Sequence, residues 1–496
     1  MPGLKKCLIP LALASVLAGC GSTVSSGQSG LAGAAQGADL NGLANPATSG
    51  LSTPTAALGS ASTDAAGQLP GAASSNQGTS AMATDTNGQP PRRVGAKLSD
   101  VLIGYPTSRD LSAVASNVGI AGADTGDLDA QASILAADIN SRGGLLGHRI
   151  VLVNHDISTA QATSDPAAAA QAACTDWVQD HHVFAVADTA EGLGASPGLR
   201  DCLTKAKVPL ISNGGFSDAD YASSPLFASP SSMTLDRYLP AVVDRLVAQG
   251  FFGKWDAIQG KSGTAPVKIG AQSFDNEQGR HYIAVLRKAL ARHGLTLDQV
   301  ESHSSDVSAN AASTSSAVLR FKAQGVTHIF NANLLFYKDS DSQSYHPRYA
   351  IDDTVPTPQL LAKNVGKSQL HGAMGVGYQP LAEVEGAPDI GPAATRCFWL
   401  MRKGGQSTSA QFTRTVMANV CDNFFLLEAA FKSSGVLTPT GMITGVSRLG
   451  TAFKSAFTYQ PGFSTNKHYG ANRVRDFVYS DVCGCFTYPS TTTYQV

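Results

Sequence analysis

The sequence has few charged residues, and the charges that it has nearly cancel. Lysine and arginine number 36 against 37 aspartates and glutamates, so charged residues make up 15% of the chain and the formal net charge is −1. A protein that binds nucleic acid through its phosphates needs a clear basic excess. The composition therefore gives no electrostatic basis for a nucleic-acid partner.

Long apolar runs are also scarce. The run from Cys7 to Leu17 is too short to span a bilayer, and no other stretch approaches the roughly 20 apolar residues that a transmembrane helix needs. Common catalytic, nucleotide-binding and metal-binding motifs are missing too. The sequence has no P-loop, no pair of metal-binding carboxylates and no Cys-His dyad. We therefore expect no enzymatic activity, no metal site and no cofactor.

The amino-terminal segment has the features of an export signal. Lys5 and Lys6 precede the apolar run, which ends in Leu17-Ala18-Gly19-Cys20. This ending resembles the processing box of bacterial lipoproteins. The resemblance implies that residues 1–19 are a signal peptide, that Cys20 carries a lipid, and that the chain is extracytoplasmic and anchored to the cell membrane. An ordinary secretory signal with a chance cysteine is the alternative.

Residues 20–97 are rich in glycine, serine, alanine and threonine and have almost no aromatic or charged side chains. Such a segment cannot bury enough surface to offset its chain entropy, so it is expected to be disordered. A flexible chain of about 77 residues reaches roughly 50 Å on average. The segment is therefore interpreted as a tether that holds a folded part away from the membrane.

Cysteine usage indicates an oxidising compartment. Eight cysteines are present, and six remain for disulfides if Cys7 leaves with the signal and Cys20 takes lipid. Proximity along the chain predicts three disulfides: Cys174–Cys202, Cys397–Cys421 and Cys483–Cys485. An exchange of partners among the last four cysteines stays open at this point.

Residues 127–156 predict a helix followed by a strand. The helical spacing is set by four apolar residues: Leu128, Ala132, Leu135 and Ile139. The helix should stop at Gly143-Gly144, where left-handed backbone angles carry no side-chain penalty. The apolar run Ile150–Val153 then predicts a strand that is buried on both faces. Asp156 follows at the carboxyl end of this strand, the edge where open α/β sheets bind ligands.

Strand-like and helix-like segments alternate along the rest of the chain. Expected strands are 101–104, 183–187, 208–212, 267–272, 326–331 and 371–378. Expected helices are 167–180 after the cap Asp165-Pro166, 195–206, 235–249, 277–293 and 310–324. Residues 393–457 should be mainly helical, and 477–488 should give a last pair of short strands. The alternation predicts an α/β protein with parallel sheets in two lobes.

The stretch INSRGGLLGHRIVLVNHD, followed by DPAAAAQAA, resembles the first helix–strand unit of type I periplasmic binding proteins, in the branched-chain amino-acid receptor branch of ABC importers. The resemblance covers roughly residues 98–488. It implies two doubly wound parallel-sheet lobes, joined by a three-strand hinge, that enclose a ligand. Lobe 1 would be 98–225 plus 378–470, and lobe 2 would be 226–377 plus 471–488. The hinge strands would lie near Leu226–Ser229, Gly375–Tyr378 and Arg473–Val478.

In such a cleft the ligand meets loops at the carboxyl ends of strands from both lobes. The candidate contacts from lobe 1 are Tyr105, Thr107, Thr189, Ala190, Glu191, Asn213, Gly214 and Phe216. Those from lobe 2 are Phe274, Asp275, Asn331, Asn333, Phe336 and Asp352. Amino-acid receptors of the family hold the ligand carboxylate in lobe 1 and its ammonium with an acid of lobe 2, here Asp352 or Asp353. Glu191 would repel an anion, so an amino acid and a neutral or cationic solute both stay open.

Gly194-Ala195-Ser196-Pro197-Gly198 matches the G-x-S-x-G elbow of α/β hydrolases. The oxyanion hole of such enzymes uses the N–H of the residue after the serine, and Pro197 has none. We therefore interpret Pro197 as an early helix residue, and an exported hydrolase is the least supported hypothesis.

The leading hypothesis is a lipid-anchored protein that captures a small polar solute, such as an amino acid, and delivers it to an ABC permease in the membrane. A ligand sensor or surface interaction module with the same fold is the second hypothesis. Ligand identity and oligomeric state are left open by the sequence.

Overall fold

The computed structural model describes residues 99–108, 110–113, 120–159, 161, 165–189, 196–214, 216–303, 307–353, 358–387 and 391–496. The expected signal peptide, the lipidation site Cys20 and the expected tether lie outside these residues, as do Ala190 and Glu191. Helices alternate with strands that form two large sheets and one small hairpin, β6 (Trp255–Asp256) with β7 (Lys261–Ser262). The α/β prediction is confirmed.

The first sheet has five parallel strands in the order β2-β1-β3-β4-β5. Their bounds are β1 Ser99–Thr107, β2 His148–Asp156, β3 Ala185–Ala187, β4 Leu210–Ile211 and β5 Phe227–Ala228. The expectation that Ile150–Val153 is buried on both faces is wrong. Because β2 lies at the edge of the sheet, Val151 and Leu152 are only half-buried, whereas Ile150 is 4% exposed.

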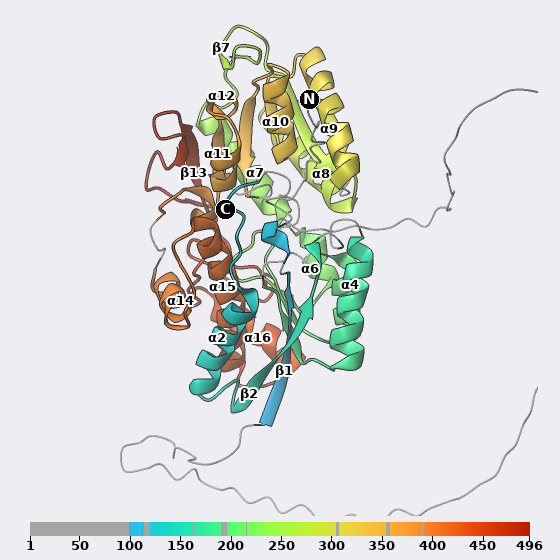
Figure 1. The fold of residues 1–496 in the computed structure, drawn as a ribbon, viewed down its shortest axis with the longest axis vertical. Helices are drawn as coiled ribbons and strands as arrows, with labels where there is room; N and C mark the ends of the chain where they lie inside the picture. Colours follow the sequence, from blue (N-terminus) through green and yellow to red (C-terminus); the bar gives the residue numbers. More distant parts are fainter. Residues whose placement is uncertain are drawn as a thin grey trace, which may run out of the picture. The chain divides into compact units, whose positions relative to one another are not determined.

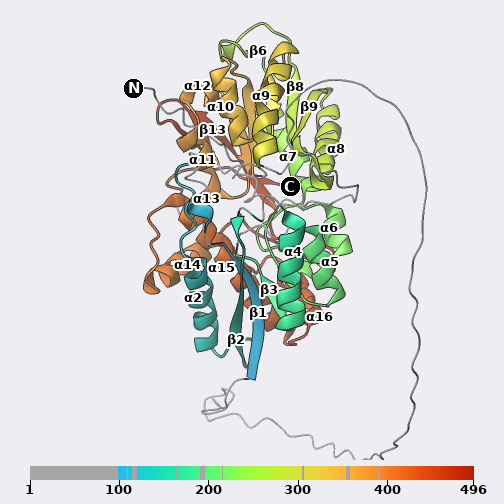
Figure 2. The same cartoon turned by 45° about the vertical axis from the view of Figure 1, so that its right-hand side comes forward.

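Helices cover both faces of the first sheet, and Figures 1 and 2 show α2 and α4 on opposite sides of β1 and β2. One face packs against α2 (Leu128–Ser141) and α15 (Gln411–Ser434), with α14 (Pro392–Lys403) and α16 (Pro439–Leu449) beside them. The other face packs against α4 (Pro166–Cys174), its π-helical continuation Thr175–Asp180 and α5 (Pro197–Lys205). The short helix α6 spans Asp218–Ser223.

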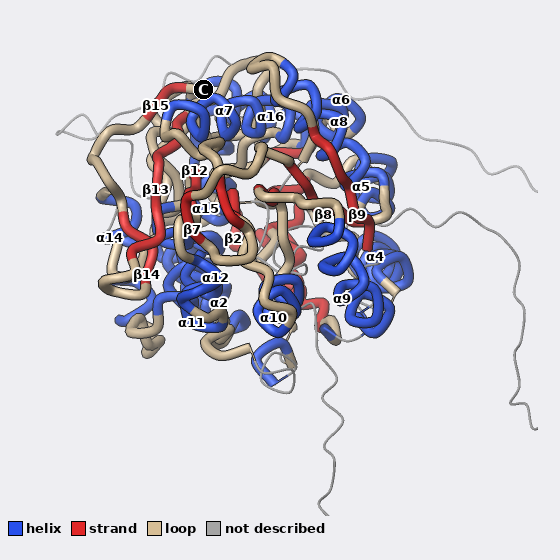
Figure 3. Tube along the Cα trace, turned by 90° about the horizontal axis from the view of Figure 1, so that it is seen from above, coloured by secondary structure: helices blue, strands red, loops and turns tan. Residues whose placement is uncertain are grey.

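The second sheet has the order β14-β13-β12-β11-β10-β8-β9. The bounds are β8 Ile269–Phe274, β9 Leu297–His303, β10 His328–Phe330, β11 Arg348–Asp352, β12 Met374–Gly377, β13 Arg473–Ser480 and β14 Cys485–Thr487, with β15 Tyr494–Gln495 paired to β13. Strands β8 to β12 are parallel, and β13 and β14 add an antiparallel extension, which Figure 3 shows beside β12. The parallel part, β9-β8-β10-β11-β12, repeats the strand order of the first sheet.

The helices of the second sheet also divide between its two faces. One face packs against α7 (Leu235–Ala248) and α8 (Glu277–Ala291). The other packs against α9 (Val307–Ala323), α10 (Leu334–Ser342), α11 (Pro358–Asn364) and α12 (Lys367–Leu370). The strands β9 and β11 and the helix α10 have no counterpart among the elements that the sequence predicted.

The chain passes between the two sheets three times: after β5, after β12 through α13 (Pro380–Glu383), and before β13. The first and third passages lie side by side, because Gly470 N–H donates to the Ser229 carbonyl at 2.8 Å and Ala471 N–H donates to the Ser232 carbonyl at 2.9 Å. The structure thus joins its two lobes by three segments. The lobe boundaries given from the sequence stay a prediction.

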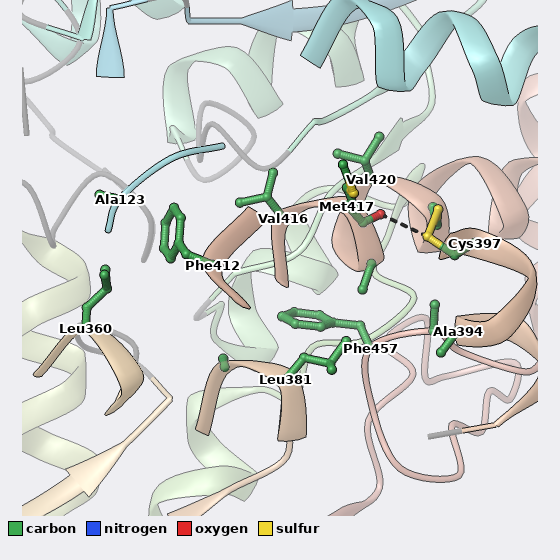
Figure 4. Close-up of a cluster of buried hydrophobic side chains, with 14 of the residues drawn as sticks. Ala123, Leu360, Leu381, Ala394, Cys397, Phe412, Val416, Met417, Val420 and Phe457 are labelled. Carbon is green, nitrogen blue, oxygen red and sulfur yellow. Dashed lines mark hydrogen bonds between the residues drawn. A yellow bond between two sulfur atoms is a disulfide. The ribbon is translucent and has the colours of Figure 1, made fainter. Parts of the chain in front are cut away.

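A further contact joins the lobes away from these passages. The side chain of Asn364 on α11 accepts from the backbone N–H of Ala121 at 2.8 Å and donates to the Ala121 carbonyl at 3.0 Å. Beside it, Leu360, Ala123 and Phe412 belong to one buried apolar cluster, shown in Figure 4. We refer to the Asn364–Ala121 pair as the interlobe latch.

Three disulfides are formed, and they are the three that the sequence predicted. Cys174–Cys202 joins α4 to α5, Cys397–Cys421 joins α14 to α15, and Cys483–Cys485 closes the turn between β13 and β14. Within the described ranges, no helix is long and apolar enough to cross a membrane.

Candidate functional site

The strand order of each sheet reverses direction at one place. In the first sheet this happens between β1 and β3, and in the second between β8 and β10. Doubly wound sheets bind ligands outside the carboxyl ends of the strands at such a switch point, because the connections on either side run to opposite faces and leave a crevice. The candidate site is therefore built from the ends of these four strands and the helices that follow them.

The end of β1 carries a buried polar network. Thr107 is 1% exposed, and its hydroxyl lies 2.9 Å from Asn154 Oδ1 and 3.0 Å from Asp156 Oδ1. The hydroxyl of Tyr105 donates to Asp129 Oδ1 at 2.8 Å. Strand β1 extends three residues beyond the predicted Gly104, so both residues belong to the strand itself rather than to a loop.

A cavity of about 510 Å³ lies at this end of β1. It is lined by Thr107, Ser108, Ser112 and the segment from Asp124 to Asp129 at the start of α2. Among the described residues of its wall, three are aspartates and none is a cation. The cavity therefore suits a positively charged or hydrogen-bond-donating group.

The ends of β3 and β4 are tied to the neighbouring backbone. The buried hydroxyl of Thr189 donates to the carbonyl of Pro106, and Ser212 Oγ donates to Asp188 Oδ2 at 2.6 Å. Thr189 thus contributes to the join between β1 and β3, at the switch point where it was predicted to meet ligand.

The side-chain amide of Asn213 forms hydrogen bonds through both its nitrogen and its oxygen. Its Nδ2 donates to Asn419 Oδ1 at 2.6 Å, and its Oδ1 accepts from the N–H of Ser231 at 2.9 Å. The N–H of Gly214 donates to Ser232 Oγ at 2.7 Å. This loop is therefore held by α15 and by the first interlobe passage.

Of the six contacts predicted in the second lobe, three lie at or near the surface and three are buried. Phe274 packs edge-on against His303 with ring centroids 4.5 Å apart, and the side chain of Asp275 is 75% exposed. Asn331 has a φ of 57° and donates to the Gln272 carbonyl at 2.9 Å, so it stays at the end of β10.

The other three lie deeper. Asn333 is the N-cap of α10, where its side chain accepts from the N–H of Phe336 at 2.9 Å. Phe336 is fully buried against Phe321, which places it in the core with no surface to offer to a solute. Asp352 is 1% exposed and accepts from the Tyr282 hydroxyl at 2.9 Å.

A second cavity, of about 310 Å³, is lined from both lobes at the carboxyl ends of β3, β4 and β8. Of the predicted contacts that the structure describes, Phe216 alone lies in its wall. The other lining residues are Pro197, Arg200, Ser217, Ala219, Asp220, Leu235, Glu277, Gln278, Arg280 and His281. Its volume falls in the range of pockets that hold small molecules.

Both signs of charge line this cavity. Arg200 is 5% exposed, forms an ion pair with Asp220 and lies over the ring of Phe216, 5.3 Å from its centroid. Burial lowers the pKa of Arg200 from its ordinary value. On the opposite wall, His281 Nε2 lies 3.0 Å from Asp236 Oδ1, and the Asp236 carboxylate also accepts from the N–H of Asp218 at 2.8 Å.

Sequence reasoning missed most of this second cavity because it considered the loops directly after the strands. Apart from Phe216 and Ser217, which precede α6, the lining residues lie near the starts of α5, α6, α7 and α8. A search of the first helical turn after each strand would have found Arg200, Glu277 and His281.

A buried pair of acids lies at the second interlobe passage. Asp353 Oδ2 accepts from the N–H of Tyr378 at 2.5 Å, and Glu383 accepts from the N–H of Gln379 at 2.5 Å and from the Tyr488 hydroxyl at 2.6 Å. Burial raises the pKa of both carboxyl groups. The two acids therefore hold their protons more tightly than exposed carboxyl groups do.

The geometry also bears on the hydrolase motif. Ser196 is 3% exposed and Pro197 is the first residue of α5, as the sequence predicted for Pro197. Strand β3 ends at Ala187, nine positions before the serine, whereas a nucleophile elbow places its serine in the tight turn directly after a strand. Among the described residues, no group of three or more His, Cys, Asp or Glu side chains could hold a metal ion.

The arrangement was compared with known proteins. The model of the family described as periplasmic binding protein matches residues 110–336. No curated protein matches the sequence.

Several solved structures share the fold. A branched-chain amino-acid ABC transporter protein from Thermus thermophilus with bound valine is 15% identical, with a TM-score of 0.58 over 81% of this chain and 98% of that one. A solute-binding protein of an ABC transporter from Rhodopseudomonas palustris HaA2, in complex with p-hydroxybenzoic acid, is 14% identical, with a TM-score of 0.56 over 80% and 97%. An extracellular ligand-binding receptor from Verminephrobacter eiseniae is 15% identical, with a TM-score of 0.55 over 79% and 100%. These findings confirm the resemblance carried by residues 139–156 and 165–173: the chain has the fold of the type I periplasmic binding proteins.

Proposed function

We propose that this chain is an extracytoplasmic solute-binding protein that captures a small polar solute between its two lobes and delivers it to an ABC permease. The observation that carries the proposal is the repeated strand order of the two sheets together with a cavity lined from both. Two such lobes joined by three chain segments can close on a solute by hinge motion, because contacts to both lobes stabilise the closed state.

The lining favours a solute with both a positive and a negative group, such as an amino acid. The cavity at β1 is acidic, and the cavity between the lobes carries arginine and carboxylate side chains around Phe216. The similar structures from Thermus thermophilus and Rhodopseudomonas palustris contain valine and p-hydroxybenzoic acid, so aromatic acids belong in the same screen.

The test is a thermal-shift screen of amino acids, aromatic acids, amides, polyamines and sugars on the full chain. A solute at 100 times its dissociation constant should stabilise the folded state by about 2.7 kcal/mol. Ala219→Trp, which fills the interlobe cavity, should abolish the shift. Ala222→Trp, on an exposed position of the same helix α6, is the matched control and should retain it. If both variants retain the thermal shift, this cavity is not the solute site.

The expected lipid anchor is a second part of the proposal. It rests on Leu17-Ala18-Gly19-Cys20 and would hold the binding protein near its permease. Growth with an alkyne-labelled fatty acid should label the wild-type chain in the membrane fraction. A Cys20→Ser variant should be unlabelled, and equal labelling of both would contradict lipidation at Cys20.

A further inference from the structure

The turn between β13 and β14 carries a disulfide between Cys483 and Cys485, which are only two positions apart. Cys483 is exposed, Cys485 is half-buried, and Val482 beside them is 97% exposed. Because attack on a disulfide requires that a thiolate reach one of its sulfur atoms, exposure sets which disulfides can react.

The other two disulfides differ from Cys483–Cys485 in burial and in the length of the loop that they close. Cys397 and Cys421 are both 0% exposed, and Cys174 is 6% exposed. Their partners are 24 and 28 positions apart. A longer closed loop removes more entropy from the unfolded chain, so these two bridges stabilise the fold far more than the two-residue bridge does. The Cys483–Cys485 bond is therefore both the most accessible of the three and the least useful as a structural link.

A lysine lies directly over this turn. Gly484 has a φ of +66°, and a Cβ built on it would lie 2.7 Å from Cε and 3.1 Å from Nζ of Lys367. The ammonium group is thus held against the turn that joins the two cysteines. A neighbouring cation favours the thiolate over the thiol and so makes a cysteine a better leaving group.

The carboxylate at the turn already has a partner. His371 Nδ1 lies 2.6 Å from Asp481 Oδ2. The Asp481 carboxylate is therefore engaged by His371, and Lys367 supplies the cation nearest to Gly484.

We propose that the Cys483–Cys485 disulfide is a thiol–disulfide exchange site that takes a thiol, either a small molecule or a cysteine of another protein. The incoming thiolate sulfur forms a bond to Sγ of Cys483, the bond between the two cysteines breaks, and its electron pair leaves on Cys485 as a thiolate. A second thiolate that attacks the mixed disulfide at the incoming sulfur releases Cys483. In sum, two thiols become one disulfide, and the cysteine pair takes up the two electrons and two protons.

The rest of the turn can stay folded during this exchange. Phe486 packs edge-on against Phe477 and Tyr479, with ring centroids 5.6 and 5.4 Å apart. These contacts hold β14 on β13 without help from the disulfide. Exchange is therefore expected in the native protein.

The experiment exposes the folded full chain to 2-mercaptoethanol in one arm and to reduced thioredoxin in the other. Free cysteines are then alkylated with iodoacetamide and located by peptide mass spectrometry. Cys483 and Cys485 should be alkylated at least about tenfold faster than the other four bridged cysteines in at least one arm. The faster arm identifies a small thiol or a protein thiol as the source. Equal rates for Cys174 and Cys202, or no reaction at Cys483 and Cys485 in either arm, would overturn the proposal.

Three further variants separate exchange from simple exposure. Lys367→Gln should slow the alkylation of Cys483 about threefold, because its leaving partner loses the neighbouring cation. Lys363→Gln, on the preceding helix α11, should leave the rate unchanged. Cys485→Ser retains Cys483 as a free thiol, and incubation with oxidised glutathione should add one glutathione to it. No adduct, or equal rates in both lysine variants, would contradict the assigned roles.

Discussion

Replacing Asp422 with asparagine should make the stability of this protein less sensitive to pH. Asp422 lies on α15 and is fully buried, where its carboxylate accepts from the Ser455 hydroxyl and from the N–H of Ala456 at 2.5 Å. Burial, the largest cause, raises the pKa of this carboxyl from 3.8 to about 7. The folded protein therefore binds this proton more tightly than the unfolded chain does.

The sign and size follow from proton linkage. Because the pKa is raised, the contribution to stability is fully present below pH 3.8 and is lost as the pH rises through about 7. One pKa unit corresponds to about 1.4 kcal/mol, so the whole shift sets an upper limit of about 4.4 kcal/mol. Between about pH 5 and about pH 8, the free energy of unfolding should fall by roughly 2.6 kcal/mol from this group alone.

The assay is urea unfolding of the wild type and of Asp422→Asn at these two pH values. Asparagine keeps an acceptor for the Ala456 N–H and carries no titrating proton. The change in the free energy of unfolding with pH should therefore be about 2 to 3 kcal/mol smaller in the variant than in the wild type. Asp201→Asn, at an exposed position on α5, should behave as the wild type does. Parallel pH profiles for the wild type and Asp422→Asn would refute the reasoning.

Three other substitutions have defined outcomes. Glu428→Gln should cost about 1 to 3 kcal/mol in urea unfolding, because Glu428 pairs with both terminal nitrogens of Arg142, and an unchanged midpoint would count against this pair. Gly445→Ala should cost about 1 to 3 kcal/mol in thermal unfolding, because its Cβ would lie 1.8 Å from the Ala430 carbonyl oxygen and force α16 away from α15; unchanged stability would contradict this close approach. Asn364→Ala removes both hydrogen bonds of the interlobe latch and should change solute affinity by about tenfold in calorimetry, whereas equal affinity would show that the latch does not bias closure.

Local chemistry was enough to predict most helices. The side chain of Asp165 accepts from the N–H of Ala168 and Pro166 occupies the first turn, so the start of α4 was visible in the sequence. The end of α2 could also be predicted, from Gly143-Gly144. In the structure Gly144 has a φ of +69°, and a Cβ there would lie 1.9 Å from the His148 carbonyl oxygen. Such signals act within a few residues and need no knowledge of the tertiary fold.

The burial of β2 could not be predicted in the same way. Ile150–Val153 is as apolar as a central strand, but within the described part of the chain β2 is the outermost strand of the first sheet. Edge position depends on the order in which distant segments pair. The sequence predicted the strand itself and gave the wrong exposure for two of its residues.

The candidate site was predictable only as a location. The rule that ligands meet the carboxyl ends of strands selected Thr107, Asn213 and Phe274, and the structure has all three at such strand ends. What each side chain does there depends on partners far away in the sequence, such as Asn419, which accepts from Asn213 across 206 positions. No local pattern in the sequence reveals such a partner, so the roles stay predictions until a solute is found.

The positions of the latch and of the interlobe cavity restrict how the lobes can move. The latch involves α11 and the segment before α2, which cover one face of each sheet, whereas α5 and α8, on the opposite faces, line the cavity. The latch joins the lobes on one face, and on the cavity side the N–H of Asp218 donates to the Asp236 carboxylate, so opening on the cavity side must break that hydrogen bond. A solute that enters between α5 and α8 would then be enclosed by rotation about the latch side. The buried acids Asp353 and Glu383 lie at the second passage, where burial raises the pKa of both carboxyl groups.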